Sequence, residues 1–361
     1  MASMSLPPPT FTQFSLWVKS HLLTKNRPPP ADLSLKGQTA LITGANSGLG
    51  LATAKVLLQH GLSRLVIACR SVDKGQQAAA PLRAKYEASG AEILVWELDM
   101  LSYDSIQRLV KRCQMDLHPL KDSASGRGLD IAILSAGVAQ AEFELNESTG
   151  HEVMMQTNYL STALLAFLLL PVLKAKRTQK PGRLTIVASS TGLTTAFANR
   201  NEDPLLPTFD DRKQWDATGG FERYGVSKTL VLMLLAKLGE QPLVDDEGNA
   251  VTVNALEPGL VTGSNLFRHA KMGIEKVALT IMGMMGGRTP EQGAWMYVHA
   301  AAVVDEKSHG AFLMNWETYQ VHPFMYTPEG KKITDKLWEE TLKEFEFAGV
   351  RDILKSLGYK G

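Results

Sequence analysis

Cysteine is scarce in this chain, and neither sign of charge is in excess. Only Cys69 and Cys113 occur among 361 residues, and neither lies in a Cys-x-x-Cys or Cys/His cluster, so no disulfide framework and no metal site are expected. The 38 basic and 37 acidic residues give a formal net charge of +1 without a basic stripe, which disfavours nucleic acid and anionic membranes as partners. A small, weakly charged substrate and a reducing, cytoplasmic compartment fit this composition.

Long apolar runs are also missing. A bilayer-spanning helix needs roughly 20 apolar residues, whereas the longest such stretch runs from Ala163 to Leu173, which we expect to be a buried or interface helix. Near the N-terminus, Phe14 to Val18 is too short and too broken for a signal-peptide core. The sequence therefore predicts no transmembrane segment.

Proline clusters set the start of the chain apart. Residues 1–36 hold Pro7-Pro8-Pro9 and Pro28-Pro29-Pro30 around Phe11 to Leu23, a segment that could form one amphipathic helix. We expect these residues to be an N-terminal arm. Residues 37–330 are expected to form one domain, followed by a C-terminal helical extension over 331–361.

From Gln38 onward, short apolar runs alternate with helical patterns. The runs are continuously apolar, as in strands buried on both faces of a parallel sheet. Between the third and fourth runs, Ile106, Leu109, Val110 and Cys113 share one helix face. The pattern predicts an α/β fold with a doubly wound parallel sheet, whose ligand crevice lies at the carboxyl ends of the strands. The expected strands are Thr39–Thr43, Leu65–Cys69, Ile93–Leu98, Ile131–Ser135, Leu184–Ala188, Val251–Leu256 and Ala311–Met314.

A glycine-rich turn follows the first expected strand and opens a helix near Leu49. Its glycines have the spacing G-x3-G-x-G, which lets the turn tighten and the backbone approach a pyrophosphate at the positive end of the helix. A glycine-rich connection without a ligand is the alternative, but the strand before and the helix after favour a dinucleotide cofactor. The residues expected to bind it are Gly44, Asn46, Ser47, Gly48, Leu49 and Gly50.

The end of the second strand predicts which nicotinamide cofactor is used. An acidic residue there would bind the adenine ribose, whereas a basic one favours the 2′-phosphate of NADP(H). The strand ends at Arg70 and Lys74 follows. No acidic residue lies between the end of the strand and Asp73. Arg70 suits bidentate phosphate contact, although an arginine at this place can also be a solvated surface residue. We expect NADP(H).

Tyr224 and Lys228 lie four residues apart at the start of an apolar helix, so they share one helix face. A nearby ammonium favours the phenolate and lowers the tyrosine pKa toward a value useful in acid/base catalysis. The pair alone is weak, because helix-surface pairs arise by chance. Ser190 follows the fifth expected strand, where a serine can hold a substrate oxygen or simply cap a helix.

Taken together, these motifs resemble the short-chain dehydrogenase/reductase family over roughly residues 37–320. Within it, the chain looks like the retinol-dehydrogenase-like branch and fungal members from secondary metabolism. The resemblance implies a Rossmann-type fold in which Tyr224 is the general acid/base, Ser190 orients the substrate oxygen, and Lys228 binds the nicotinamide ribose. Asn158 would hold a water linked to that lysine. The resemblance rests on Thr43 to Gly50, Asp99 as the adenine contact, Ser135-Ala136-Gly137, Asn158, Ser190, Tyr224 with Lys228, and Pro258-Gly259 with Val261.

Family members commonly form homodimers through the helix that carries the Tyr/Lys pair and the helix before it. The apolar stretches Leu164–Leu170 and Leu230–Leu238 suit such an interface, and burial within one chain explains them equally well.

The chain departs from the family pattern in three places. Ser135 stands where asparagine is usual, and Gly263 where threonine is usual. The gap from Ser190 to Tyr224 is long, with an insertion at 199–222 that we expect either to shape the substrate site or to be a solvated loop. The methionine-rich segment 264–290 is expected to be a substrate lid or, alternatively, a core helix.

The sequence thus predicts an NADP(H)-dependent oxidoreductase that interconverts a ketone or aldehyde and an alcohol on a hydrophobic small molecule, such as a polyketide, terpenoid or retinoid-like compound. Two alternatives stay open. One is a dinucleotide-binding sensor without catalysis, and the other is an isomerase or cyclase of the same fold without net redox change.

Overall fold

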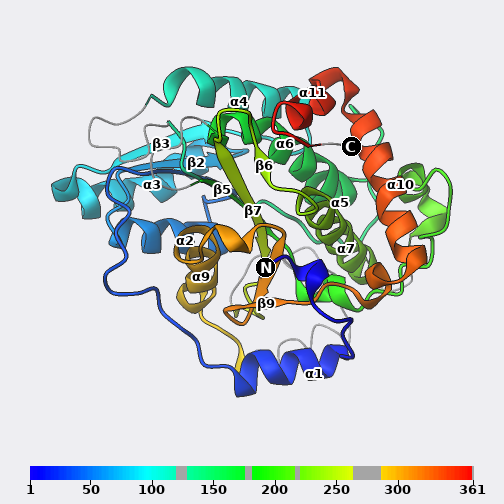
Figure 1. The fold of residues 1–361 in the computed structure, drawn as a ribbon. Coiled ribbons are helices and arrows are strands. Elements are labelled where there is room, and N and C mark those ends of the chain that lie inside the picture. Colours follow the sequence, from blue (N-terminus) through cyan, green and yellow to red (C-terminus); the bar gives the residue numbers. More distant parts are fainter. Residues whose placement is uncertain (119–127, 175–180, 216–219, 263–285, 360–361) are drawn as a thin grey trace.

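The computed structural model describes residues 1–118, 128–174, 181–215, 220–262 and 286–359 (Figure 1). In these residues a nine-stranded, mostly parallel sheet runs in the order β3-β2-β1-β4-β5-β7-β8-β9, with β6 paired to β7. Only the β6–β7 and β8–β9 pairs are antiparallel. The strands are β1 Thr39–Thr43, β2 Arg64–Cys69, β3 Glu92–Glu97, β4 Ile131–Leu134, β5 Gly182–Val187, β6 Leu243–Val244, β7 Ala250–Leu256, β8 Ala311–Met314 and β9 Glu317–Tyr319.

The seven expected strands all occur, and the α/β prediction is confirmed. Every residue of β1 and β4 is buried, as continuous apolar runs predict for strands covered on both faces. Expected and observed ends agree to within about two residues. The sequence did not predict β6 or β9, because strands of two and three residues are too short to show a hydrophobic period.

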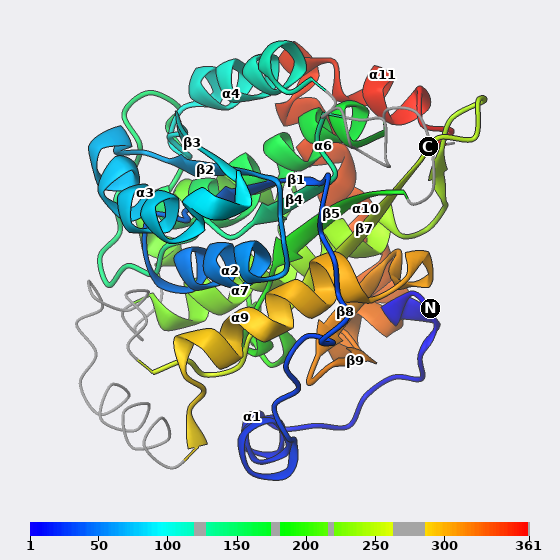
Figure 2. The same ribbon diagram turned by 90° about the vertical axis from the view of Figure 1, so that its left-hand side faces the viewer.

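Helices cover both faces of the sheet (Figures 1 and 2). One face packs against α2 Gly48–Gln59, α3 Val72–Tyr86 and α9 Pro290–Val298. The other packs against α4 Tyr103–Asp116, α6 Ser161–Lys174 and α7 Phe221–Leu238. The predicted apolar face of α4 is buried in this second layer.

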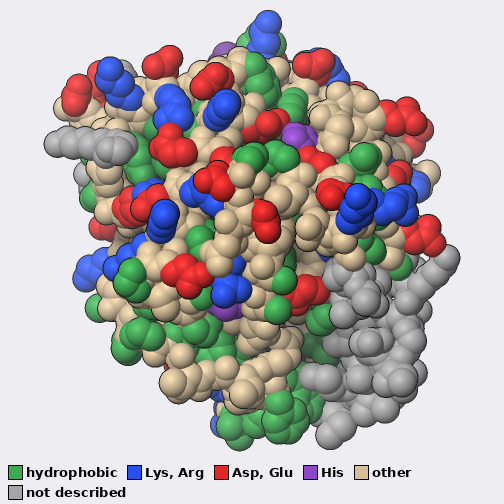
Figure 3. Space-filling model, turned by 90° about the vertical axis from the view of Figure 1, so that its right-hand side faces the viewer, with side chains coloured by type: hydrophobic (Ala, Val, Ile, Leu, Met, Phe, Trp, Pro, Cys, Tyr) green, Lys and Arg blue, Asp and Glu red, His purple; other side chains and the backbone are tan. Residues whose placement is uncertain are grey.

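The C-terminal helices α10 Pro328–Glu344 and α11 Val350–Lys355 lie over α6 and α7. The Phe167 ring meets Trp338 edge-on at 5.6 Å between centroids, and the Tyr159 and Thr341 hydroxyls are hydrogen-bonded at 2.7 Å. The apolar stretches Leu164–Leu170 and Leu230–Leu238 are therefore buried within one chain, apart from the half-buried Leu168, Ala236 and Lys237. The outer face beside these helices carries acidic and basic side chains interspersed (Figure 3).

By length and composition, one helical stretch in the described residues could cross a membrane: Val153–Lys174, of 22 residues. It comprises α5 Val153–Met155, a π-helix over Gln156–Leu160, and α6. Buried residues make up 94% of its most apolar window, so its apolar side chains are covered by the protein itself. Its second half is the stretch that was expected to be a buried or interface helix.

The N-terminal arm is packed against the domain. Thr12 and Ser15 cap α1 Gln13–Val18 reciprocally: the Ser15 amide donates to Thr12 Oγ1, and the Thr12 amide donates to Ser15 Oγ. A π-helix over Lys19–Leu23 continues it. Ahead of α1, the Ser3 amide donates to the Gly310 carbonyl at 3.0 Å, and the Phe312 amide of β8 donates to Ser3 Oγ at 2.7 Å.

Candidate active site

A cavity of about 320 Å³ opens at the carboxyl ends of the central strands. The residues that follow β1, β4, β5 and β7 all line it: Gly44, Ser135, Ser189 and Glu257. Doubly wound sheets bind their ligands at this edge. The cavity is also lined by Tyr224 and Lys228 from α7 and by residues of α1.

The glycine turn has the backbone that its sequence predicts. Gly44 and Gly48 have φ of +70° and +54°, which L side chains rarely adopt. A Cβ on Gly44 would lie 3.2 Å from Ala136 Cα, and one on Gly50 would lie 2.9 Å from Ala45 Cα. A Cβ on Gly48 would meet nothing within 4 Å, so the turn leaves open space there. Asn46 lies in the same turn and is half-buried.

Helix α2 begins at this turn, and no side chain of its N-cap residue accepts a hydrogen bond from its first amides. Ser47 is the N-cap residue, yet its hydroxyl does not bond to the helix. The turn and the helix start line the cavity through Gly44, Ser47, Gly48, Leu49 and Gly50. Open space, free amides and the positive helix end fit a pyrophosphate group.

The residues expected to bind the adenine end of the cofactor follow the neighbouring strands β2 and β3. Arg70 directly follows β2 and is exposed, and Lys74 is exposed in the first turn of α3. Ser71 between them caps α3 by accepting the Lys74 amide at 3.3 Å. Asp99 follows β3, and its Oδ1 accepts the Leu101 amide at 3.0 Å. These side chains stand beside the glycine turn rather than in the cavity wall around Tyr224.

Ser135, at the usual asparagine position, is integrated into the strand junction. Thr43 Oγ1 accepts the amides of both Ser135 and Ala136 at 2.9 Å. The Ser135 hydroxyl is 3.2 Å from the Tyr297 hydroxyl of α9, within hydrogen-bond distance. Tyr297 also lines the cavity, and no sequence motif pointed to it.

Tyr224 and Lys228 are both buried on the cavity side of α7. The Tyr224 and Ser189 hydroxyls are hydrogen-bonded. The neighbouring Ser190, which the sequence predicted for this position, instead donates to Glu257 Oε1 at 3.3 Å. Ser189, which the sequence reasoning did not single out, and Ser190 both line the cavity that Tyr224 lines.

Lys228 and Asn158 complete the cluster. Lys228 Nζ donates to the Val187 carbonyl at 2.9 Å and lies 5.8 Å from the centre of the Tyr224 ring. Asn158 lies in the π-helix, an element often found at functional sites. Its Oδ1 accepts the Val138 amide, and its Nδ2 donates to the Val138 carbonyl, both at 2.9 Å.

Gly137 sits against this cluster. A Cβ there would lie 3.2 Å from Asn158 Oδ1 and 3.7 Å from Lys228 Nζ. The absence of a side chain at Gly137 therefore lets the amide and the ammonium approach the cavity.

The tyrosine pKa does not follow the sequence-based expectation. Burial raises the pKa of Tyr224 above its usual value, although the Ser189 hydrogen bond opposes the rise. Burial also lowers the pKa of Lys228 to about 8. The helix places the ammonium beside the ring as expected, but desolvation of the buried phenol, with Tyr297 and the Glu257 charge, raises the tyrosine pKa. Tyr224 is thus protonated at neutral pH.

Glu257 is a buried carboxyl in the same wall. Burial raises its pKa, and the Arg288 charge, the Gly259 amide and Ser190 partly counter that rise. Its Oε1 accepts from Ser190, whereas Oε2 has no donor in hydrogen-bond geometry among the described residues. No motif signalled this residue, which directly precedes Pro258-Gly259.

Pro258, Gly259 and Val261, which the sequence analysis assigns to cofactor binding, line the cavity. Gly259 has φ of +85°, and a Cβ there would collide with the Arg288 guanidinium, 2.6 Å from its Nη1. Thr262, directly before the Gly263 that stands where threonine is usual, donates from Oγ1 to the Arg288 carbonyl at 3.2 Å. The expected lid at 264–290 lies outside the described residues up to position 285.

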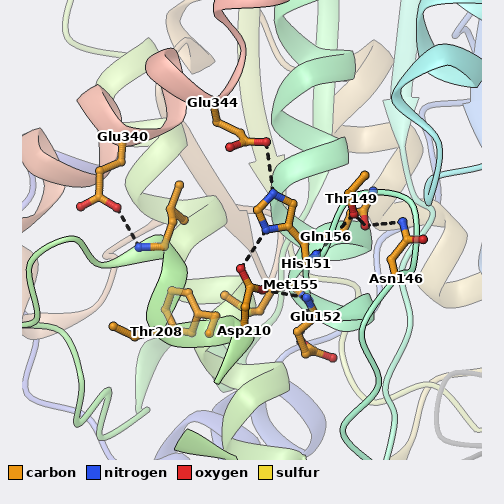
Figure 4. A network of polar contacts seen from close by, with 12 residues as sticks. Asn146, Thr149, His151, Glu152, Met155, Gln156, Thr208, Asp210, Glu340 and Glu344 are labelled. Carbon is orange, nitrogen blue, oxygen red and sulfur yellow. Dashed lines mark hydrogen bonds and ion pairs between the residues drawn. The ribbon is translucent and has the colours of Figure 1, made fainter. Parts of the chain in front are cut away.

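Of the insertion at 199–222, the described residues touch the cavity only through Phe221. Elsewhere in the insertion, α10 binds Leu205 and Leu206 directly and Asp210 through His151 (Figure 4). The Glu340 carboxylate accepts the amides of Leu205 and Leu206 at 2.8 and 2.7 Å. His151 bridges Asp210 and Glu344, with Nδ1 at 2.9 Å from Asp210 Oδ2 and Nε2 at 3.1 Å from Glu344 Oε1.

Within the described residues, no group of three or more His, Cys, Asp or Glu side chains could hold a metal ion. Cys69 and Cys113 are free and buried.

Comparison with known proteins identifies the family. A family model described as short chain dehydrogenase matches residues 38–200. The short chain dehydrogenase/reductase mfmJ of Annulohypoxylon moriforme is 44% identical over 99% of both chains. The short chain dehydrogenase virL of Hypocrea virens is 37% identical over 92% of both chains.

Solved structures of similar fold include the carbonyl reductase Sniffer of D. melanogaster, with a TM-score of 0.53 and 20% identity over 79% of this chain and 99% of that one. An NADPH-bound carbonyl reductase from chicken fatty liver also has a TM-score of 0.53 and 20% identity, over 81% of this chain and 96% of that one. At this identity the likeness concerns the fold. The extensive sequence identity with the fungal relatives shows that the chain belongs to the short-chain dehydrogenase/reductase family of oxidoreductases, which use nicotinamide cofactors on small-molecule substrates.

Proposed function

We propose that this protein is an NADP(H)-dependent reductase or dehydrogenase that interconverts a carbonyl group and an alcohol on a hydrophobic small molecule. The observation that carries the proposal is the cluster of Tyr224, Ser189 and Lys228 in the wall of the cavity that the glycine turn also lines, with Asn158 behind Gly137. This arrangement brings a proton donor, a hydroxyl that can hold an oxygen, and a cation to the cavity that the glycine turn lines.

The residues present fit the cofactor. The amides at the start of α2 and the open space at Gly48 would hold its pyrophosphate. Lys228 would bind the nicotinamide ribose, and Pro258 to Val261 would lie along the nicotinamide. Asp99 would contact the adenine, and Ala136 and Gly137 would border the dinucleotide. When bound, NADPH supplies the hydride.

Tyr224 is suited to protonate the carbonyl oxygen during reduction. Its raised pKa keeps the phenol protonated at neutral pH, so a proton is available when charge develops on the substrate oxygen. Ser189, hydrogen-bonded to the same phenol, would hold that oxygen in place. The Lys228 ammonium, one helical turn away, would stabilise the phenolate left behind. The predicted role for Ser190 passes to Ser189, while Ser190 holds Glu257.

The preference for NADP(H) follows from Arg70 and Lys74. Both are exposed at the edge where the adenine ribose would lie, and no ion pair of theirs is found in the described residues. Their charges are thus available for a 2′-phosphate.

A hydrophobic substrate fits the cavity wall, where Leu16, Trp17, Val138, Phe221 and Leu260 are apolar. The similarity to fungal short-chain dehydrogenases supports a product of secondary metabolism, such as a polyketide or terpenoid. Two free buried cysteines fit a reducing, cytoplasmic compartment.

The test is to follow NADPH absorbance with purified protein and a panel of hydrophobic ketones and aldehydes, comparing wild type with Tyr224→Phe. We expect turnover by wild type and a loss of at least about 100-fold in the variant, the usual worth of a positioned proton donor. Undiminished turnover in the variant would overturn the assignment of Tyr224. NADPH binding without turnover of any carbonyl would favour a sensor.

A further inference from the structure

The N-terminal arm forms one wall of the cavity that holds Tyr224. Four residues of the arm line this cavity although they lie well before β1 in the sequence: Leu16, Trp17, Ser20 and His21. Trp17 is 9% exposed, whereas Phe14 on the outer side of α1 is 70% exposed. In both ribbon views α1 lies at the opposite end of the molecule from α11 (Figures 1 and 2).

His21 fixes this wall to two loops beside the cavity. The Leu260 amide donates to Nε2 at 3.0 Å, and Nδ1 donates to the Gly286 carbonyl at 3.0 Å. A ring nitrogen that accepts from an amide carries no proton, so the ring is neutral. Burial and the nearby Arg288 charge lower the His21 pKa to about 4, so both contacts persist at neutral pH.

Arg288 joins the same wall to the loop expected along the nicotinamide. Its guanidinium donates to Pro258 O at 2.7 Å, and to the arm at Asn26 Oδ1 and Ser20 O at 3.0 and 3.3 Å. The arginine side chain is fully buried, so these bonds must be made to satisfy its charge. The arm is therefore fixed in place at the active site.

Trp17 brings an unused donor to the wall. Its Nε1 is buried and has no acceptor among the described residues. Its ring packs against Phe14 and His21, with centroids 6.2 and 6.1 Å away. A buried N–H without an acceptor is unfavourable. Because the nitrogen has almost no exposed surface, a ligand oxygen in the cavity relieves that cost once the indole turns toward it.

We propose that α1 selects the substrate: Leu16 and Trp17 shape the apolar part of the site, and Trp17 Nε1 donates a hydrogen bond to a second oxygen on the substrate. The substrate class is an apolar carbonyl compound with an acceptor oxygen, such as an ether or hydroxyl, away from the reacting carbon. This role presupposes the reduction proposed above, because it takes the reacting carbonyl to lie at Tyr224.

The experiment compares kcat/KM for NADPH-dependent reduction of benzaldehyde and of three isomer pairs, the 2-, 3- and 4-methoxybenzaldehydes against the ethyl isomers of the same shape. Wild type should prefer at least one methoxy isomer by about fivefold, the effect of one hydrogen bond. Trp17→Phe, which keeps the ring and removes the N–H, should abolish that preference. Trp17→Ala and Leu16→Ala should raise KM for the substituted aldehydes about tenfold but change benzaldehyde less than threefold. The exposed Leu23→Ala is the matched control on the arm.

If the ratio of kcat/KM between the methoxy and ethyl isomers were the same in wild type and Trp17→Phe for every pair, the proposed hydrogen bond from Trp17 would be refuted. If Trp17→Ala raised KM equally for benzaldehyde and for the larger aldehydes, the proposal that α1 shapes the substrate site would be wrong. Should wild type reduce no aldehyde, the proposed reduction fails instead, and the isomer pairs are compared by calorimetric binding to the NADPH-loaded protein. There, Trp17→Phe must still remove the methoxy preference, and an unchanged preference refutes the hydrogen bond.

Discussion

Replacing His151 with glutamine should remove a pH-dependent part of the free energy of unfolding, which comes from the contact between α10 and the insertion. His151 lies between Asp210 and Glu344 (Figure 4), and its side chain is 16% exposed. Burial by itself would lower the histidine pKa, but the hydrogen bonds and charges of the two carboxylates outweigh it and raise the pKa from 6.5 to about 9.

The size of the effect follows from this shift. One pKa unit corresponds to about 1.4 kcal/mol, so a shift from 6.5 to about 9 stabilises the folded state by at most about 3 kcal/mol. Partial exposure of Asp210 and Glu344 reduces this to about 2 kcal/mol. Because the folded-state pKa is raised, the stabilisation is fully present below pH 6.5 and is lost as the pH rises through 9.

The assay is urea unfolding followed by circular dichroism at pH 6, 7.5 and 9.5 for wild type and His151→Gln. Burial raises the pKa of Glu152 to about 7, so the difference between the two proteins, not the wild-type curve alone, isolates the histidine. The free energy difference should be about 2 kcal/mol at pH 6 and approach zero at pH 9.5. A difference that does not change with pH would refute the ion-pair account. The exposed His118→Gln variant should match wild type throughout.

Three further predictions concern the active site. Ser189→Ala should lower kcat/KM by about 100-fold, and Ser190→Ala by less than tenfold, because the Ser189 hydroxyl is bonded to Tyr224 whereas Ser190 donates to Glu257; the reverse order would restore the original assignment to Ser190. Arg70→Asp should weaken NADPH binding, measured by fluorescence titration, much more than NADH binding; equal losses would remove Arg70 from the phosphate site. In reduction, kcat/KM should fall as the pH rises above about 8, since Lys228 then loses its charge; the same pH profile in Lys228→Met would exclude the lysine as its cause.

The sheet and the cofactor turn could be predicted because each depends on local sequence. Buried parallel strands such as β1 and β4 need continuous apolar runs, and the turn at Gly44 and Gly48 needs backbone angles that glycine adopts readily. Such requirements leave a direct trace in the sequence.

Other parts of the site depend on contacts between distant segments. Consecutive residues of an extended chain point to opposite sides, so which of Ser189 and Ser190 meets Tyr224 depends on the packing of α7 against the turn at Ser190–Leu193. The arm was recognised as a helix, but its place at the cavity depends on His21 and Arg288, which are far apart in sequence. Glu257 and Tyr297 became visible only with the fold.

The central claim is that the nicotinamide hydride ends on a substrate carbon while Tyr224 protonates the oxygen. The direct measurement uses NADPH carrying deuterium at the transferable C4 position, with the product analysed by NMR and mass spectrometry. One deuterium on the carbinol carbon, and at least about 100-fold slower product formation by Tyr224→Phe, is the predicted result. Product formed without deuterium would indicate an isomerisation or cyclisation and would contradict the account.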